Sequence, residues 1–175
     1  MEIVIRCAHT TSDFQSIYKL NYDTFVREIP QHPETPEHLL VDRFNDHNRY
    51  VMALRDEALV GMVCYSLTRP FSLDEKGCNI DHHLPPYTRL AEVRLLAVAP
   101  DYRKSSVTYK LLHRLCAELI STGVDMAVIS GITNQIPLYL KLGFIPFGER
   151  VGKAGALFQP MYISLKNLRN DFKTN

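Results

Sequence analysis

Several residue types are scarce in this chain, which has no tryptophan, eight glycines and four cysteines. The cysteines lie far apart and form no CxxC pair, so they predict reduced thiols of a cytoplasmic protein rather than a disulfide framework or a zinc site. No apolar run approaches the ~18–20 residues of a membrane span. The N-terminal sequence MEIVIRCAHTTSDF lacks a charged segment followed by a long apolar stretch, so we expect no membrane association and no secretory signal.

An excess of charge of one sign is also missing. The 20 Lys and Arg residues nearly balance the 19 Asp and Glu residues, which gives a formal net charge of +1. Because nucleic-acid-binding proteins usually present a basic face, this balance predicts no nucleic-acid partner. With 46% hydrophobic and 22% charged residues, the chain is not intrinsically disordered. A length of 175 residues fits a single domain over residues 1–175, since one domain commonly holds roughly 100–200 residues.

The hydrophobic pattern predicts helices and strands in a mixed order. Strands are expected at 3–8, 49–55, 58–68, 90–98, 126–132, 145–148 and 158–165. Helices are expected at 13–27, 105–121 and 134–142. Ser12 and Gln15 resemble a capping box for the first helix, and Asn134 is the expected cap of the last. The order strand, helix, strand over 90–132 predicts a βαβ unit with a parallel strand pair, within an α+β fold that has a mixed sheet.

The junction between the strand at 90–98 and the helix at 105–121 carries the most informative chemistry. Its sequence VAPDYRKSSVT places Arg103 and Lys104 just before a helix that is expected to begin at Ser105. Helix N-termini present free N–H groups that bind phosphate oxygens, and two cations strengthen such contacts. The stretch therefore indicates either a diphosphate site or an ordinary serine-capped helix behind a solvated basic turn.

Two segments in this order resemble the signatures of the GNAT superfamily of N-acyltransferases. RLLAVAPDYRKSSVTYKLL is similar to the family's strand and Q/R-x-x-G-x-G/A pyrophosphate loop, and LYLKLGF at 138–144 is similar to F-Y-x-K-L-G-F. The resemblance is strongest over residues 90–148. It implies an α+β fold with a mostly antiparallel central sheet, a βαβ core and flanking helices. It also implies an enzyme that transfers an acyl group, with acetyl as the first candidate, from acetyl-CoA or another acyl-CoA. The acceptor would be the amine of a small molecule or peptide, and the reaction would need no metal.

The resemblance assigns roles to single residues by position. Donor-binding residues are implied along the strand end, the loop and two helix starts, namely Leu96, Ala97, Val98, Arg103, Lys104, Ser105, Ser106, Val107, Thr108 and Asn134. Tyr139 would protonate the departing thiolate as general acid, and Glu92 would accept the amine's proton as general base. The acceptor would be contacted by Arg94, Phe25 and Tyr22.

Structural alternatives stay open for these residues. Tyr139 could pack between helix and sheet, and Tyr22 and Phe25 fit an ordinary core. Alternation by two places Glu92 on one face with Arg94, Leu96 and Val98, and a buried carboxylate requires either a function or a partner such as Arg94 or Lys110. A further cluster of possible metal ligands comprises Cys78, Asp81, His82 and His83. Its spacing matches no zinc pattern and is typical of a solvated loop.

The loop departs from the family pattern where Ser106 and Thr108 replace its two glycines. Their N–H groups remain available, but their Cβ atoms limit the approach of a phosphate. A donor without the ADP portion would need no glycine there. This favours a second hypothesis, an enzyme similar to N-acyl amino acid and acyl-homoserine lactone synthases, which often take a long acyl chain from acyl carrier protein. YKLNYDTFVREI and AEVRLLAV are similar to segments of those enzymes, although Leu95 occupies the place of their usual arginine. A catalytically degenerate acyl-CoA-binding or interaction module is a third hypothesis, and a homodimer is left open.

Overall fold

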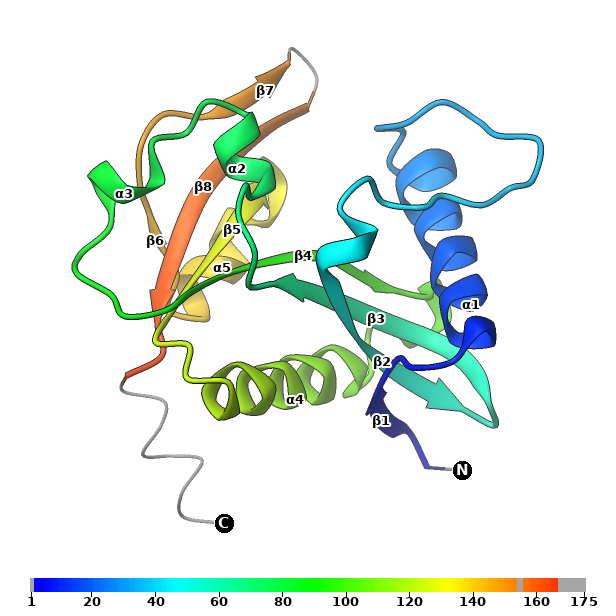
Figure 1. Ribbon diagram of the computed structural model, residues 1–175. Coiled ribbons are helices and arrows are strands. Elements are labelled where there is room, and N and C mark those ends of the chain that lie inside the picture. The colour runs from blue at the N-terminus through cyan, green and yellow to red at the C-terminus, as the bar shows by residue number, and fades with distance from the viewer. Residues whose placement is uncertain (1, 154–155, 167–175) are drawn as a thin grey trace. The chain divides into compact units, whose positions relative to one another are not determined.

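A computed structural model describes residues 2–153 and 156–166 (Figure 1). Contacts divide the chain into two compact units. Unit 1 holds the chain up to Tyr65 together with Leu95–Leu115, and unit 2 holds Ser66–Arg94 together with the residues from Cys116 on. The boundary passes through strand β4 (Leu90–Val98) and helix α4 (Val107–Ser121), so both elements contribute to both units.

The strands follow the hydrogen-bonded order β1-β2-β3-β4-β5-β8-β6, with β7 paired to β8. Besides β4, their bounds are β1 (Val4–Cys7), β2 (Asn48–Arg55), β3 (Ala58–Ser66), β5 (Met126–Ile132), β6 (Ile145–Pro146), β7 (Val151–Lys153) and β8 (Ala156–Ser164). β4 and β5 pair in parallel, with Glu92 opposite Val128, as the βαβ pattern predicted. β1–β2, β5–β8, β6–β8 and β7–β8 are antiparallel. The expected mixed, mostly antiparallel sheet is confirmed.

Unit 1 packs helix α1 (Thr11–Tyr22) beside the hairpin of β2 and β3 (Figure 1). The shared core contains Ile17, Phe25, Tyr50, Met52, Met62, Cys64 and Ala97. α1 is capped by Thr10 and Asp13, each accepting a hydrogen bond from the other's N–H at 3.1 Å. The predicted box of Ser12 and Gln15 was therefore wrong, since Thr10 already supplies the cap two residues earlier.

The sequence predicted a helix up to residue 27, but the α-helical part ends at Tyr22. After Tyr22 it widens into a π-helix, η1 (Asp23–Glu28), in which the N–H of Ile29 donates to the carbonyl of Thr24 five residues back at 2.8 Å. Irregular chain follows, up to the short 3₁₀ turn η2 (Asn45–His47). π-helices are rare and frequently occur at functional sites.

Unit 2 contains the segment 69–89, for which the sequence predicted neither helix nor strand and which holds two one-turn helices, α2 (Ser72–Glu75) and α3 (Ile80–His83). They are ordered by burial, because apolar side chains of this segment join the strand residues in one core of Phe71, Leu73, Ile80, Leu90, Met126, Val128 and Phe147. After β5 come the 3₁₀ turn η4 (Thr133–Gln135) and helix α5 (Ile136–Lys141). Asn134 lies within η4 and does not cap α5. The N-cap residue of α5 is Gln135, and it makes no side-chain cap hydrogen bond.

Candidate functional site

Strand β4 carries the first predicted donor contacts, and its regular geometry is interrupted at Leu95. This residue has a φ of 54°, a left-handed conformation that side chains other than glycine rarely adopt. A residue of this kind breaks the alternation of side chains along a strand. The predicted shared face of Glu92, Arg94, Leu96 and Val98 therefore does not continue through β4.

The loop after β4 folds around its own polar groups. The 3₁₀ turn η3 (Pro100–Tyr102) follows the strand, and the hydroxyl of Ser105 donates to the carbonyl of Tyr102 at 2.6 Å. The same oxygen accepts the N–H of Val107 at 3.2 Å, so α4 begins at Val107, two residues later than predicted. The first N–H groups of an α-helix lack partners within the helix and attract anions. Because Ser105 and Ser106 are exposed, this helix start is accessible from solvent.

Arg103, the first cation of this loop, is held by two partners. Its Nε donates to the carbonyl of Val98 at 2.9 Å. Its two remaining guanidinium nitrogens donate to the two carboxylate oxygens of Glu28, the last residue of η1. These hydrogen bonds from Arg103 lower the pKa of the Glu28 carboxyl below its ordinary value. The first predicted phosphate ligand is thus already paired with a carboxylate, whereas Lys104 lies exposed beside it.

A groove of about 380 Å³ runs along this ion pair in unit 1. Its lining combines two cations, two carboxylates and apolar side chains, among them Lys19, Asp23, Glu28, Leu59, Pro100 and Arg103. Part of the lining comes from η1, so the π-helix brings both of its acidic residues to the groove.

Tyr22 and Phe25, the predicted acceptor contacts in the first helix, are both buried. Phe25 belongs to the core of unit 1. The centroid of the Tyr22 ring lies 5.3 Å from that of the His38 ring and 5.2 Å from the guanidinium carbon of Arg27. This placement favours a structural role for both rings. Their part in acceptor binding stays a prediction.

Glu92 lies on the unit 2 part of β4 and is 1% exposed. Its carboxylate accepts hydrogen bonds from the N–H and the hydroxyl of Ser72, at 2.8 and 2.6 Å, and from the N–H of Leu73 at 3.1 Å. Arg94 adds an ion pair, with its Nε 3.9 Å from Oε2. These partners satisfy a buried charge that would otherwise be costly. The contacts favour Glu92 as the anchor of α2, and its role as a general base stays a prediction.

The segment anchored by Glu92 is further ordered by Arg69. The guanidinium of Arg69 donates to both oxygens of Asp74 and to both oxygens of Asp81, and Tyr87 donates its hydroxyl to Asp81. This network ties the start, middle and end of the 69–89 segment together. It also accounts for Asp81, which the sequence left in a solvated loop.

Tyr139 lies on α5 in unit 2, half-buried, with its ring against β5. A Cβ added at Gly131 would approach the Tyr139 ring to 3.1 Å, so the glycine provides the space for the ring. Phe144 packs edge-on at a centroid distance of 6.1 Å. A phenol with the ordinary tyrosine pKa of about 10 is protonated at neutral pH. Burial raises the pKa of the Tyr139 hydroxyl above that value, so it also keeps its proton in more alkaline solution. That is the form a general acid requires.

Sequence reasoning missed an amine–hydroxyl contact in unit 2. Lys76 Nζ donates to the hydroxyl of Ser130 at 3.0 Å and lies 4.7 Å from the centroid of the Phe158 ring. Lys76 and Ser130 are 54 residues apart, so no local pattern could have revealed the contact.

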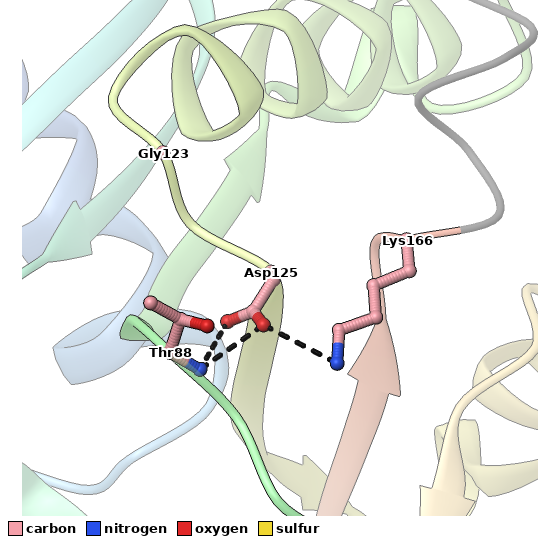
Figure 2. A pocket seen from close by; sticks show the side chains of 4 residues that line it. All are labelled: Thr88, Gly123, Asp125 and Lys166. Carbon is pink, nitrogen blue, oxygen red and sulfur yellow. Dashed lines mark hydrogen bonds and ion pairs between the residues drawn. The ribbon is translucent and has the colours of Figure 1, made fainter.

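A second polar group missed by the sequence surrounds Asp125, at a pocket of about 360 Å³ (Figure 2). Asp125 accepts the N–H of Thr88 at 3.0 Å and the N–H of Arg89 at 2.9 Å, and Lys166 Nζ lies 3.5 Å away. Burial raises the pKa of the Asp125 carboxyl, but the N–H groups of Arg89 and Thr88 and the Lys166 ammonium together outweigh it and leave the pKa below its ordinary value. This carboxylate joins the chain before β4 to the start of β5.

Neither a metal centre nor a membrane helix is visible in the described part of the chain. Residues 2–153 and 156–166 contain no group of three or more His, Cys, Asp or Glu side chains placed to hold a metal ion. Within the same residues, no helix has the length and apolar character needed to span a bilayer.

Comparisons with known proteins identify related sequences and folds. A family model described as "Acetyltransferase (GNAT) family" matches residues 14–144. No curated protein sequence matches significantly. Among solved structures, the CoA-dependent acyl-homoserine lactone synthase BjaI matches with a TM-score of 0.81 at 18% identity, over 98% of this chain and 87% of that chain.

Two further solved structures have the same fold. The acyl-homoserine lactone synthase LasI has a TM-score of 0.78 at 13% identity, over 94% of this chain and 91% of that chain. An acyl-CoA N-acyltransferase from Pseudomonas aeruginosa has a TM-score of 0.66 at 16% identity, over 92% and 99%. At these identities the similarity establishes the fold, and the predicted α+β class is confirmed.

Proposed function

The chain belongs to the acetyltransferase (GNAT) family, whose model spans most of it, and from this we propose that it transfers an acyl group from an acyl-CoA to an amine. The observation that carries the proposal is the loop between β4 and α4. There Arg103 and Lys104 stand at the accessible start of a fifteen-residue helix, in the order that the family uses for a diphosphate. Cations beside free helix N–H groups suit the phosphates of such a donor.

The residues present fit a CoA-type donor, with one difference from the family pattern. Ser106 and Thr108 keep the N–H donors that two glycines would provide, and their hydroxyls add hydrogen-bonding groups. The backbone groups of Leu96, Ala97 and Val98 line the pantetheine arm in this proposal, and Asn134 contacts it from η4. The donor supplies a thioester, whose carbonyl carbon is the point of attack.

Tyr139 gives its proton to the departing thiolate as general acid, since a phenol is protonated at neutral pH and burial raises the pKa of this one further. Glu92 takes the role of a positioning residue in this proposal, in place of the general base predicted from the sequence, and the attacking amine passes its proton to water. Its carboxylate is engaged by Ser72 and Leu73, so it fixes α2 and the 69–89 segment, which we place on the acceptor side. The acceptor is the amine of a small molecule or peptide.

A thermal-shift series tests donor binding. A ligand that binds only the native state raises Tm by linkage. We expect acetyl-CoA, a longer acyl-CoA or both to raise Tm, and pantetheine to do so less because it lacks the phosphates. If no acyl-CoA and no free CoA changes Tm at any concentration up to millimolar, the donor assignment is wrong.

A second candidate function is acyl transfer of the acyl-homoserine lactone synthase type. The observation that favours it is the TM-score, which is 0.81 for BjaI and 0.78 for LasI but 0.66 for the P. aeruginosa N-acyltransferase. BjaI has been solved with SAM and isopentyl-CoA. Under this candidate, isopentyl-CoA raises Tm more than acetyl-CoA does, and mass spectrometry detects an acyl-homoserine lactone when SAM is the acceptor. A larger shift with acetyl-CoA, and no lactone, excludes it.

A further inference from the structure

The carboxylate of Glu28 is paired with Arg103, the cation that the phosphates of the proposed donor need. Arg103 uses all three guanidinium nitrogens within unit 1, with Nε on the carbonyl of Val98 and the other two on the carboxylate of Glu28. The contact to Val98 fixes the orientation of the guanidinium. The pair of parallel N–H groups left over is the face that binds a carboxylate or a phosphate in bidentate fashion, and Glu28 fills it.

The ion pair is accessible to a ligand. The side chains of both residues are 41% exposed, and both line the 380 Å³ groove beside η3. An exposed ion pair of this kind contributes little net stability, so a better anion can replace one partner at small cost. Glu28 itself ends the π-helix, whose geometry puts its carboxylate opposite the loop.

We propose that Glu28 is a specificity-determining residue for the donor: its carboxylate competes with the donor's phosphates for Arg103. The inference rests on the proposed function, because the competing anion is the diphosphate of the acyl-CoA. A donor with a diphosphate displaces Glu28 and gains the bidentate contact. A donor without one leaves the Glu28–Arg103 pair intact and binds through its arm and acyl chain alone.

Two charge-neutralising variants test the competition by calorimetric titration with CoA and with pantetheine, which lacks the phosphates. Glu28→Gln removes the competing charge. Asp23→Asn is the matched control, since Asp23 lies on the same π-helix, lines the same groove and pairs with Arg27 at 3.2 Å rather than with Arg103. We expect Glu28→Gln to tighten CoA binding about fivefold at low salt, with the gain shrinking as salt screens the pair. Asp23→Asn, and pantetheine binding to either variant, should stay within about twofold of the native protein.

Each of the other titration results has a distinct meaning for the Glu28–Arg103 pair. If native protein binds CoA and Glu28→Gln binds it equally or more weakly, the competition is absent, while the proposed function survives. Equal gains in both variants indicate a general charge effect and also overturn the inference. If the native protein and both variants all fail to bind CoA, the proposed function fails together with it. Binding of CoA to Glu28→Gln alone would support the competition at Arg103, but it would overturn the proposed acyl-CoA donor, because the native protein would then not bind CoA.

Discussion

The carboxylate of Glu92 on β4 accepts a hydrogen bond from the hydroxyl of Ser72, with 2.6 Å between the two oxygens, although the residues are 20 positions apart in the sequence. Two backbone N–H groups of the same turn, from Ser72 and Leu73, complete the contact. A buried strand carboxylate thereby acts as the N-terminal cap of α2, whose N-cap residue, Phe71, makes no side-chain cap hydrogen bond. The position of the 69–89 segment on unit 2 depends on this contact, on the Arg69 network and on the apolar core around Phe71, Leu73 and Ile80.

Glu92→Gln should destabilise the protein more than it changes the chemistry. The amide places an NH₂ group against an N–H or O–H donor of the α2 turn, and leaving a buried donor unsatisfied costs about 1–3 kcal/mol. Urea unfolding measures this loss, and the pH profile of kcat should keep its shape. Ser72→Ala is the companion variant, expected to lose about 0.5–1.5 kcal/mol. A kcat loss of about 10²-fold or more in Glu92→Gln, with a changed pH profile and near-native stability, would instead identify a general base.

Tyr139→Phe should lower kcat about 10²-fold and leave the Kd for CoA within about twofold, because only the proton donor is removed. Tyr162→Phe is the control, since Tyr162 is another half-buried tyrosine of unit 2, on β8. The raised pKa of Tyr139 keeps the phenol protonated, so activity that depends on it should persist to alkaline pH and fall only above the ordinary tyrosine pKa of about 10. Unchanged turnover in Tyr139→Phe would exclude it as the acid.

Gly131→Ala should disturb Tyr139 without altering its hydroxyl. The added Cβ would lie 3.1 Å from the Tyr139 ring and 3.2 Å from the sulfur of Met161, so the ring must shift. Overpacking of this kind costs about 1–3 kcal/mol. We expect kcat to fall while CoA binding is retained, and Gly131→Ala combined with Tyr139→Phe to be little slower than Tyr139→Phe alone. Additive losses in the double variant would mean that Gly131 acts independently of the tyrosine.

Asp13→Asn should destabilise unit 1 at neutral pH but much less in acid. Asp13 accepts hydrogen bonds from the two terminal guanidinium nitrogens of Arg6, at 2.7 and 2.6 Å, and from the N–H groups of His9 and Thr10. The hydrogen bonds from Arg6 lower the pKa of the Asp13 carboxyl far below its ordinary value. Because the folded pKa is depressed, the stabilisation is complete above the unfolded pKa of about 3.9 and is lost as pH falls toward the folded one. Urea unfolding should show a loss of about 1–3 kcal/mol at pH 7 that shrinks markedly at about pH 2. A loss that does not depend on pH would contradict this origin.

The sequence predicted β4 and β5 to the residue, because both are short and largely apolar, and polar or proline residues follow or precede them. It also placed Tyr139 on a short helix after β5. It misplaced the end of α1 because a π-helix has no periodicity that distinguishes it from an α-helix in a six-residue stretch. The late start of α4 depends on one hydroxyl, that of Ser105, which bonds the turn before it rather than beginning the helix.

The contacts that define the candidate site were beyond local patterns. Ser72 and Glu92, Lys76 and Ser130, and Glu28 and Arg103 are each separated by 20 to 75 residues, so only the folded chain brings them together. Sequence reasoning indicated that a buried Glu92 needs a partner but named only cations as candidates. The main partners are the N–H groups and hydroxyl of α2, a turn for which the sequence predicted no helix.

The most direct test of the proposed acyl transfer is the release of free thiol when the protein is mixed with an acyl-CoA and a panel of primary amines, including SAM. The account predicts thiol release that requires both substrates, saturates with each, and falls about 10²-fold in Tyr139→Phe but not in Tyr162→Phe. Thiol release no faster than in protein-free solution, for every combination of donor and amine, would contradict it.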